Sequence, residues 1–319
     1  MTFRWCNAQN CLGVGDGKKV RPVWREGNGA WQRVVRVDAR RGALASLEVA
    51  WKLIFRVGRG EVAFTYPYEP ADLEAALKAN PAWRRQVIGV TGAGRPLEAL
   101  SLGGFPAQRG LFVVARQHCG ETPGAWVLDG LLRAARAQRD FCVIAVPAVD
   151  LDGALGGDYG KDKFPQDFNR AWSNANAMRP ETLAIRRLML RWRAAGGTPL
   201  ALDLHAPGAC EREGPYFYVS RALPEPSAAL QPFIVRAYAL LPKALRGPRE
   251  KFARFADYPT RWPMTLSFSD SAATELKWPA ASMETPYQGN GNRYYSMADY
   301  RAIGRALWKA AVETARPAT

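Results

Sequence analysis

Three runs of apolar, mostly branched residues lie in the middle of the chain. They cover residues 111–116 (LFVVAR), 141–149 (FCVIAVPAV) and 198–204 (TPLALDL). Continuous apolar runs of this length favour strands that are buried on both faces of a sheet. After the first run, Thr122 and Pro123 precede an amphipathic stretch over residues 126–135. Such a Thr-Pro pair is typical of a helix start, so the pattern predicts a strand, a loop and a helix in that order.

The first 64 residues follow a different pattern. Short branched or aromatic runs at residues 31–37 and 50–57 alternate with turn sequences at 27–29 (GNG) and 40–42 (RRG). This alternation predicts a small antiparallel β unit. We therefore expect two domains, the first over residues 1–64 and the second over residues 65–319.

The composition is that of a globular protein, because 48% of the 319 residues are hydrophobic and 23% are charged. It excludes disordered, collagen-like and coiled-coil chains. No apolar run reaches the roughly 18 to 20 residues that cross a bilayer, and residues 1–30 lack the basic-then-apolar pattern of a secretory signal. We therefore expect a cytoplasmic protein. The five cysteines form no CxxC pair, which indicates reduced thiols rather than disulfides or a cysteine zinc site.

The formal charge of +15 favours anionic partners, and the excess of basic residues is densest in the first 65 residues. The sequence has no zinc-finger spacing, no aromatic RNA-binding box and no lysine-rich tail, so we do not expect a nucleic-acid partner. We expect no membrane partner either. A solvated, arginine-rich surface is the ordinary alternative explanation of the charge.

The chain has only two histidines, and each follows a predicted strand. His118 comes directly after the first apolar run, with Glu121 three residues further on, and His205 follows the third run. The carboxyl ends of strands are where ligands bind in open α/β sheets. Two histidines and one carboxylate are the ligand set of a catalytic zinc, with the fourth position open to water. Each residue taken alone could equally be a hydrogen-bonded loop residue.

Further motifs complete an ordered series in which each member follows a predicted strand or loop. The series reads HCGET at 118–122, VDLDG at 149–153, DFNRAW at 167–172, DLH at 203–205 and METPY at 283–287. This series resembles the zinc metallocarboxypeptidases, and most closely their cytosolic branch, whose eukaryotic members trim glutamates from tubulin tails. The resemblance covers about residues 65–319. It implies an α/β fold with a mixed twisted sheet flanked by helices, a small antiparallel β-sandwich domain over residues 1–64, and one zinc ion per chain.

The resemblance also implies a role for each matching residue. His118, Glu121 and His205 match the zinc ligands, and Glu284 matches the general base. Asn169 and Arg170 match the pair that grips the terminal carboxylate of the substrate, and Asp167 matches the carboxylate that orients the first histidine. The ordinary alternatives are a surface glutamate at 284 and a turn with a surface salt bridge at 167–170.

One position departs from the family pattern. The arginine that polarises the scissile carbonyl in the cytosolic branch is replaced here by Gly160. Lys161 and Lys163 are the neighbouring cations that could take over its role in substrate binding, although solvated loop lysines are the simpler interpretation. The family also uses a mobile tyrosine, for which Tyr258 and Tyr287 are both candidates.

The sequence thus predicts a zinc-dependent carboxypeptidase that releases the C-terminal residue of a peptide or protein, with acidic ends as the candidate preference. One alternative is a related zinc deacylase or amidase that acts on an acyl-amino acid or a cell-wall peptide. Another alternative is a non-catalytic binding protein with the same fold. The oligomeric state stays open.

Overall fold

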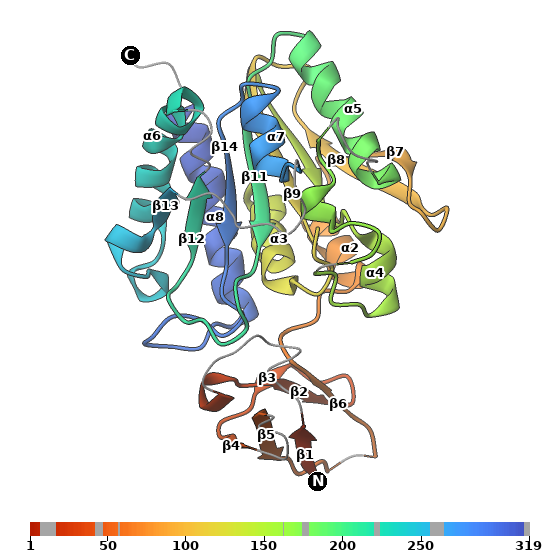
Figure 1. The fold of residues 1–319 in the computed structure, drawn as a ribbon, viewed down its shortest axis with the longest axis vertical. Coiled ribbons are helices and arrows are strands. Elements are labelled where there is room, and N and C mark those ends of the chain that lie inside the picture. Colours follow the sequence, from red (N-terminus) through yellow and green to blue (C-terminus); the bar gives the residue numbers. More distant parts are fainter. Residues whose placement is uncertain are drawn as a thin grey trace.

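The computed structural model describes residues 1–6, 17–41, 47–56, 58–161, 163–173, 179–219, 224–255 and 265–315. Its strands form two small sheets near the N-terminus and one large sheet in the rest of the chain (Figure 1). No helix in these ranges is long and apolar enough to span a membrane.

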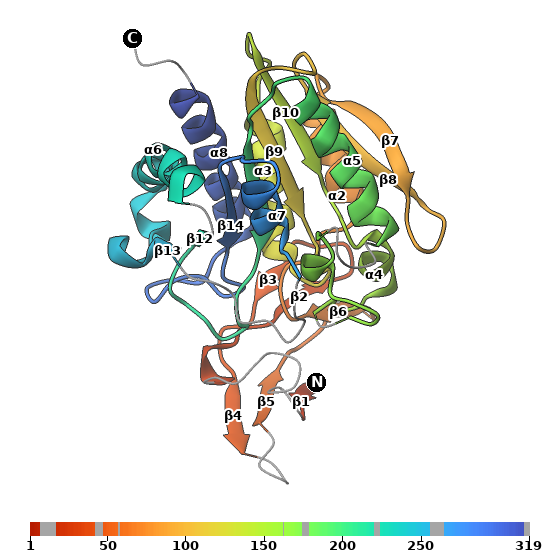
Figure 2. The ribbon, with the colours of Figure 1, turned by 45° about the horizontal axis from the view of Figure 1, so that its top comes forward.

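The two small sheets, which we call the N-terminal sheets, lie within residues 2–63. One pairs β1 (Thr2–Trp5), β5 (Leu47–Lys52) and β4 (Asp38–Arg41), and the other pairs β3 (Gln32–Arg33), β2 (Val23–Glu26) and β6 (Gly60–Ala63). All pairings within them are antiparallel, as the sequence predicts. The β3–β2–β6 sheet lies nearer to the large sheet (Figures 1 and 2). The domain division at residues 64 and 65 stays a prediction.

The large sheet has eight strands in the order β13-β12-β14-β11-β9-β10-β8-β7. Their bounds are β7 Arg84–Val90, β8 Pro96–Leu102, β9 Arg109–Ala115, β10 Phe141–Val146, β11 Leu200–His205, β12 Tyr216–Val219, β13 Ala253–Phe255 and β14 Ala280–Glu284. The four central strands β14, β11, β9 and β10 are parallel, whereas β8 pairs antiparallel with β10 and β12 pairs antiparallel with β14. The predicted mixed sheet and its three buried strands are confirmed.

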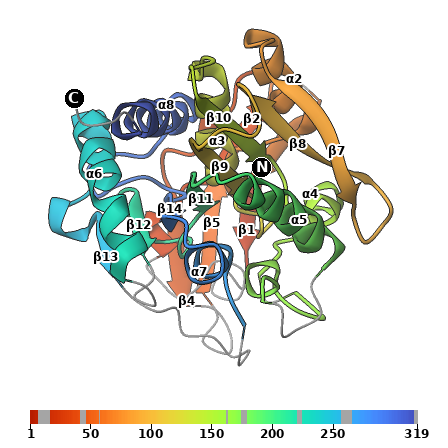
Figure 3. The ribbon, with the colours of Figure 1, turned by 90° about the horizontal axis from the view of Figure 1, so that it is seen from above.

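Helices cover both faces of this sheet (Figure 3). They are α2 Pro70–Ala79, α3 Thr122–Ala134, α4 Leu151–Gly156, α5 Pro180–Ala194, α6 Pro224–Leu240, α7 Phe268–Thr274 and α8 Met297–Thr314. Strand β9 shows how the layers form, because its side chains alternate between the two faces. Leu111 and Val113 belong to the core under α3 and α8, and Phe112 and Val114 belong to the core under α5 and α7. Both faces are apolar, which explains the uninterrupted apolar runs in the sequence.

The carboxyl ends of β11 and β14 face the N-terminal sheets. Ala206 and Ala209, which follow β11, and Tyr287, which follows β14, pack in one apolar cluster with Val49 and Trp51 of β5. The edge of the large sheet at which ligands are expected is therefore partly covered by the N-terminal sheets.

Candidate active site

The loop after β9 brings His118 and Glu121 to the edge of the sheet. β9 ends at Ala115 because Arg116 adopts a left-handed backbone conformation with φ of 58°. The half-buried Arg116 guanidinium donates to the carbonyl oxygen of Cys119 (2.8 Å) and to that of Tyr68 (3.0 Å), which fixes the loop. Glu121 then stands at the N-cap of α3, where the helix dipole favours a negative charge.

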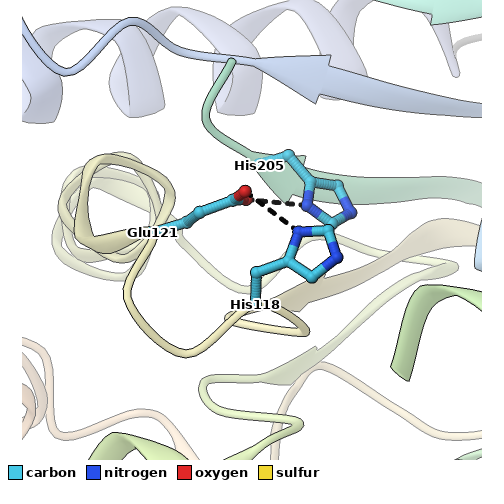
Figure 4. Close-up of side chains that lie close together, drawn as sticks. All are labelled: His118, Glu121 and His205. Atoms are coloured by element: carbon cyan, nitrogen blue, oxygen red, sulfur yellow. Dashed lines mark hydrogen bonds and ion pairs between the residues drawn. The ribbon is translucent and has the colours of Figure 1, made fainter. Parts of the chain in front are cut away.

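His205 ends β11 and completes a cluster with these two residues (Figure 4). The Glu121 carboxylate lies between the two imidazoles, with Oε1 2.9 Å from His118 Nδ1 and Oε2 2.8 Å from His205 Nδ1. One ligand atom from each of the three residues lies within 4.8 Å of the other two. Glu121 and His205 are buried, with only 1% and 2% of their surfaces exposed. We call these three residues the histidine–glutamate cluster.

The outer nitrogen of each imidazole faces a second carboxylate. His118 Nε2 lies 3.1 Å from Asp167 Oδ1, and His205 Nε2 lies 2.7 Å from Asp203 Oδ2. A carboxylate at Nε2 holds the proton on that nitrogen and leaves the Nδ1 lone pair directed at the centre of the cluster. Both histidines are therefore oriented as metal ligands would be.

The charges around the cluster shift the pKa of all three residues. Burial alone would lower the pKa of His118 and of His205, but the surrounding carboxylates raise both above their ordinary value. Burial alone would raise the pKa of Glu121, but Lys161 and the two histidines hold it well below its ordinary value. The carboxylate is thus ionised and available as a ligand.

The donor set fits a metal ion. Two Nδ1 atoms and one carboxylate converge from three sides, and both outer imidazole nitrogens are held by carboxylates. Two histidines with one glutamate are a ligand set of catalytic zinc sites. The predicted ligands are therefore brought together, and the alternative of isolated loop histidines does not describe them.

Glu284 lies next to the cluster at the end of β14. In the parallel pair of β11 and β14 it is the direct partner of His205, so both side chains point to the same face of the sheet. On its other side it is the partner of Tyr216 in β12. Only 6% of its surface is exposed. The alternative of a surface glutamate at this position is therefore wrong.

The two candidate lysines have different environments. Lys161 Nζ lies 2.9 Å from Glu121 Oε1 and 3.4 Å from the carbonyl oxygen of Ala206, so it is in contact with the cluster. Lys163 instead forms ion pairs with Asp150 (3.0 Å) and Asp158 (3.2 Å). The sequence does not indicate which of the two lysines contacts the cluster, because this depends on how the loop folds.

Gly160 is required by this loop. Its φ is 91°, and a Cβ atom there would lie 2.6 Å from the backbone nitrogen of Cys119. An arginine side chain therefore has no space at position 160. The backbone packs against the His118–Cys119 segment, and the ammonium group of the next residue, Lys161, contacts Glu121.

Asn169 and Arg170 lie in the short 3₁₀ helix Phe168–Arg170, whose N-cap is Asp167. Arg170 donates to the backbone carbonyl of Asn169 (2.8 Å). The Asn169 side chain is buried behind His205, with Nδ2 3.1 Å from His205 Nε2. The amide oxygen of Asn169 accepts hydrogen bonds from Gln117 Nε2 and from the backbone of Phe268, both at 3.1 Å.

Tyr287 is 1% exposed, and its ring lies 5.1 Å from that of Phe64, a residue that follows β6. Burial raises the pKa of Tyr287 well above its ordinary value, and the charges of Glu121 and Glu284 raise it further. Tyr258, the other candidate tyrosine, lies outside the described residues.

Sequence reasoning missed three supporting residues. Asp203 precedes His205 by two positions on the same strand, and this spacing places both on one face, so the signal was present in the sequence. Gln117 is fully buried and donates to Asp203, and its Oε1 accepts from Trp172 Nε1 (2.7 Å). Gln117 could not be identified locally, because its partners are distant in the sequence. Arg116 could not be identified either, because its contacts depend on the path of the loop.

No protein-family model matches the chain. Among curated proteins, cytosolic carboxypeptidase 1 of Danio rerio is 31% identical over 111 residues, which cover 32% of this chain and 10% of the relative. Cytosolic carboxypeptidase 6 of Caenorhabditis elegans is 23% identical over 167 residues, which cover 46% of this chain and 36% of the relative. The chain therefore matches only a tenth to about a third of the length of these relatives.

Solved structures match almost the whole chain. A metallo-carboxypeptidase from Burkholderia cenocepacia is 19% identical, with a TM-score of 0.76 over 98% of this chain and 85% of its own. A metallo-carboxypeptidase from Pseudomonas aeruginosa, in complex with (2-guanidinoethylmercapto)succinic acid, is 20% identical, with a TM-score of 0.75 over 99% and 87%. These likenesses show the fold. The fold of this chain is therefore that of the metallo-carboxypeptidases, and its sequence is similar to parts of cytosolic carboxypeptidases.

Proposed function

We propose that the protein is a zinc-dependent carboxypeptidase that releases the C-terminal residue of a peptide or protein. The observation that carries this proposal is the position of Glu284, which neighbours His205 in the sheet and thus stands beside the histidine–glutamate cluster. A metal site with an adjacent buried carboxylate has the two components that metal-assisted peptide hydrolysis needs. The relatives' names and the fold support the same reaction.

His118 Nδ1, His205 Nδ1 and the Glu121 carboxylate would hold the zinc ion. When bound, zinc supplies a Lewis acid for the scissile carbonyl and lowers the pKa of water toward neutrality. Asp167 and Asp203 keep the two imidazoles in the ligand orientation through their Nε2 atoms.

Glu284 acts as the general base. Its carboxylate takes a proton from the attacking water and passes it to the leaving amine, so that the amide bond breaks to a carboxylate and a free amino acid. Lys161 takes the position of the missing arginine and donates to the oxygen of the scissile carbonyl. Its contact with Glu121 supports this role, because it places an ammonium group at the edge of the cluster.

Arg170 binds the terminal carboxylate of the substrate, since a guanidinium matches two carboxylate oxygens. Asn169 supports it from the same 3₁₀ helix, because its backbone carbonyl accepts from Arg170 and its side chain is anchored to Gln117. Tyr287 is the tyrosine proposed to contact the substrate, and Lys163 has no role in this mechanism. The cytosolic relatives support a cytoplasmic location.

An acidic C-terminal residue is the preferred substrate in this proposal. Lys161 and Arg170 add positive charge at the site, and the whole chain carries a formal charge of +15. The preference therefore rests on the two site cations and on long-range attraction.

The first prediction concerns the metal. Purified protein should hold about one zinc per chain, the stoichiometry of a single catalytic zinc site. His118→Ala and His205→Ala should each lose most of it, because each removes one of three protein ligands. Cys210→Ser is the control and should keep its zinc, since no thiol takes part. Metal analysis by mass spectrometry would contradict the site if either histidine variant stayed fully loaded.

The second prediction compares the two lysines. Lys161→Met should lower kcat by about 10² to 10³, the usual effect of removing a donor to the reacting oxygen. Lys163→Met is the matched control and should leave kcat nearly unchanged, because Lys163 pairs with Asp150 and Asp158. Both variants should keep zinc. Equal kcat values for the two variants would remove Lys161 from the mechanism.

The third prediction concerns substrate charge. Values of kcat/KM should be higher for peptides ending in Glu than for the same peptides ending in Leu or Lys. Added salt should reduce this advantage, because it screens the attraction between an anionic substrate and a cationic protein. A faster reaction with the Lys peptide, or a salt-independent rate with the Glu peptide, would refute the acidic preference.

A further inference from the structure

The N-terminal sheets share their apolar core with two active-site loops. Val20, Val49 and Trp51 pack in one cluster with Ala206, the residue after His205, and with Tyr287, three residues after Glu284. The ring of Phe64 packs against Tyr287. The N-terminal sheets therefore contact the chain directly beyond a proposed zinc ligand and directly beyond the proposed base.

Arg33 of β3 forms the polar part of this junction. It donates to Gln288 Oε1 (3.1 Å) through one terminal nitrogen and to the backbone carbonyls of Tyr295 (2.9 Å) and Tyr287 (3.5 Å) through the other. It also donates to the carbonyl of Arg21 within the N-terminal sheets (2.7 Å). A single side chain thus joins β3 to both ends of the segment 287–295.

The environment of Arg33 is unusual for an arginine. Within the described ranges, no carboxylate lies at ion-pair distance from it, and its partners are carbonyl oxygens and aromatic rings. Its guanidinium carbon lies 4.9 Å from the ring centre of Tyr66 and 5.9 Å from that of Tyr294. A planar group with several donors in fixed directions fits such a site, whereas the single ammonium group of lysine does not.

Other groups also hold this segment. The Tyr300 hydroxyl of α8 donates to the carbonyls of Pro286 (3.0 Å) and Tyr287 (2.8 Å). Gln288 is fully buried, and its Oε1 also accepts from the backbone nitrogen of Arg21 (2.9 Å). The loss of Arg33 would remove the side-chain contacts of β3 with both ends of the segment and leave the contacts of Tyr300 and Arg21 in place.

We propose that Arg33 is a positioning residue for the reaction. It holds Tyr287 and the segment after Glu284 in place relative to the histidine–glutamate cluster, so that the N-terminal sheets form part of the active site. This inference rests on the proposed carboxypeptidase function. Its effect should appear in turnover, because a displacement of about 1 Å in a reacting group can cost on the order of 10² in rate.

The experiment uses the full-length, zinc-loaded protein with Arg33→Ala and Arg33→Lys. Both should lower kcat by about 10 to 10² while zinc content stays at the wild-type level, because misplacement affects the reacting groups and not the ligands. Guanidinium ion at millimolar concentration should restore part of the activity of Arg33→Ala, because it can occupy the vacated site. Lysine should not substitute for arginine, since its geometry differs.

Arg25→Ala is the matched control. Arg25 lies in β2 of the same sheets, is ion-paired with Glu61, and its guanidinium carbon lies 4.7 Å from the ring centre of Trp31, so these contacts stay within the first 64 residues. It should keep the kcat of the wild type. An unchanged kcat in Arg33→Lys and Arg33→Ala would overturn the proposal. So would a loss that Arg25→Ala shares or that guanidinium cannot reverse, since either would indicate a merely structural role.

A second readout does not depend on activity. Hydrogen–deuterium exchange over residues 285–295 should increase in Arg33→Ala and Arg33→Lys but not in Arg25→Ala. If the zinc-loaded wild type cleaves no peptide, the carboxypeptidase proposal fails, and the exchange data alone decide whether Arg33 holds the segment. Wild-type exchange in both Arg33 variants would contradict the positioning role in either case.

Discussion

The buried carboxylate of Glu121 is the constraint on which the site depends. A charge removed from water is stable only when donors or cations surround it. Glu121 is therefore surrounded by groups from its own loop and from two distant parts of the chain. His118 comes from the same loop, Lys161 from the loop after α4, and His205 with the Ala206 backbone from the end of β11. The same convergence makes the proposed metal site, because the groups that stabilise the carboxylate include two imidazole Nδ1 atoms.

The site also requires Glu284 to be placed precisely beside the histidine–glutamate cluster, and the parallel sheet provides this. Neighbouring strands in register direct their side chains to the same face, so Glu284 stands beside His205 without any loop to position it. The other groups are on loops, and buried polar contacts fix them instead. Arg116 holds the 118–121 loop, while Gln117 links Asp203 to Asn169. The N-terminal sheets extend this support to the segment after β14.

Much of this arrangement follows from the sequence. The apolar runs predict β9, β10 and β11, and His118, Glu121 and His205 lie at the ends of β9 and β11. These features can be predicted because a strand end and the polar residues beside it are local in the sequence. Contacts that depend on the path of a loop cannot be predicted in this way. Lys161 and Lys163 are equivalent in the sequence, yet one contacts Glu121 and the other Asp150. Arg33 gives no local signal either, because its partners in the segment 287–295 lie more than 250 residues away.

Release of a C-terminal amino acid by zinc-loaded protein tests the central proposal most directly. Wild type and Glu284→Gln would be incubated with a peptide and with its C-terminally amidated form, and free amino acid and bound zinc would be measured by mass spectrometry. We expect the wild type to release one residue from the free-acid peptide only. Glu284→Gln should keep its zinc and react about 10² to 10⁴ times more slowly, the range of general-base catalysis. Equal turnover by the two proteins, or equal cleavage of the amidated peptide, would contradict the account.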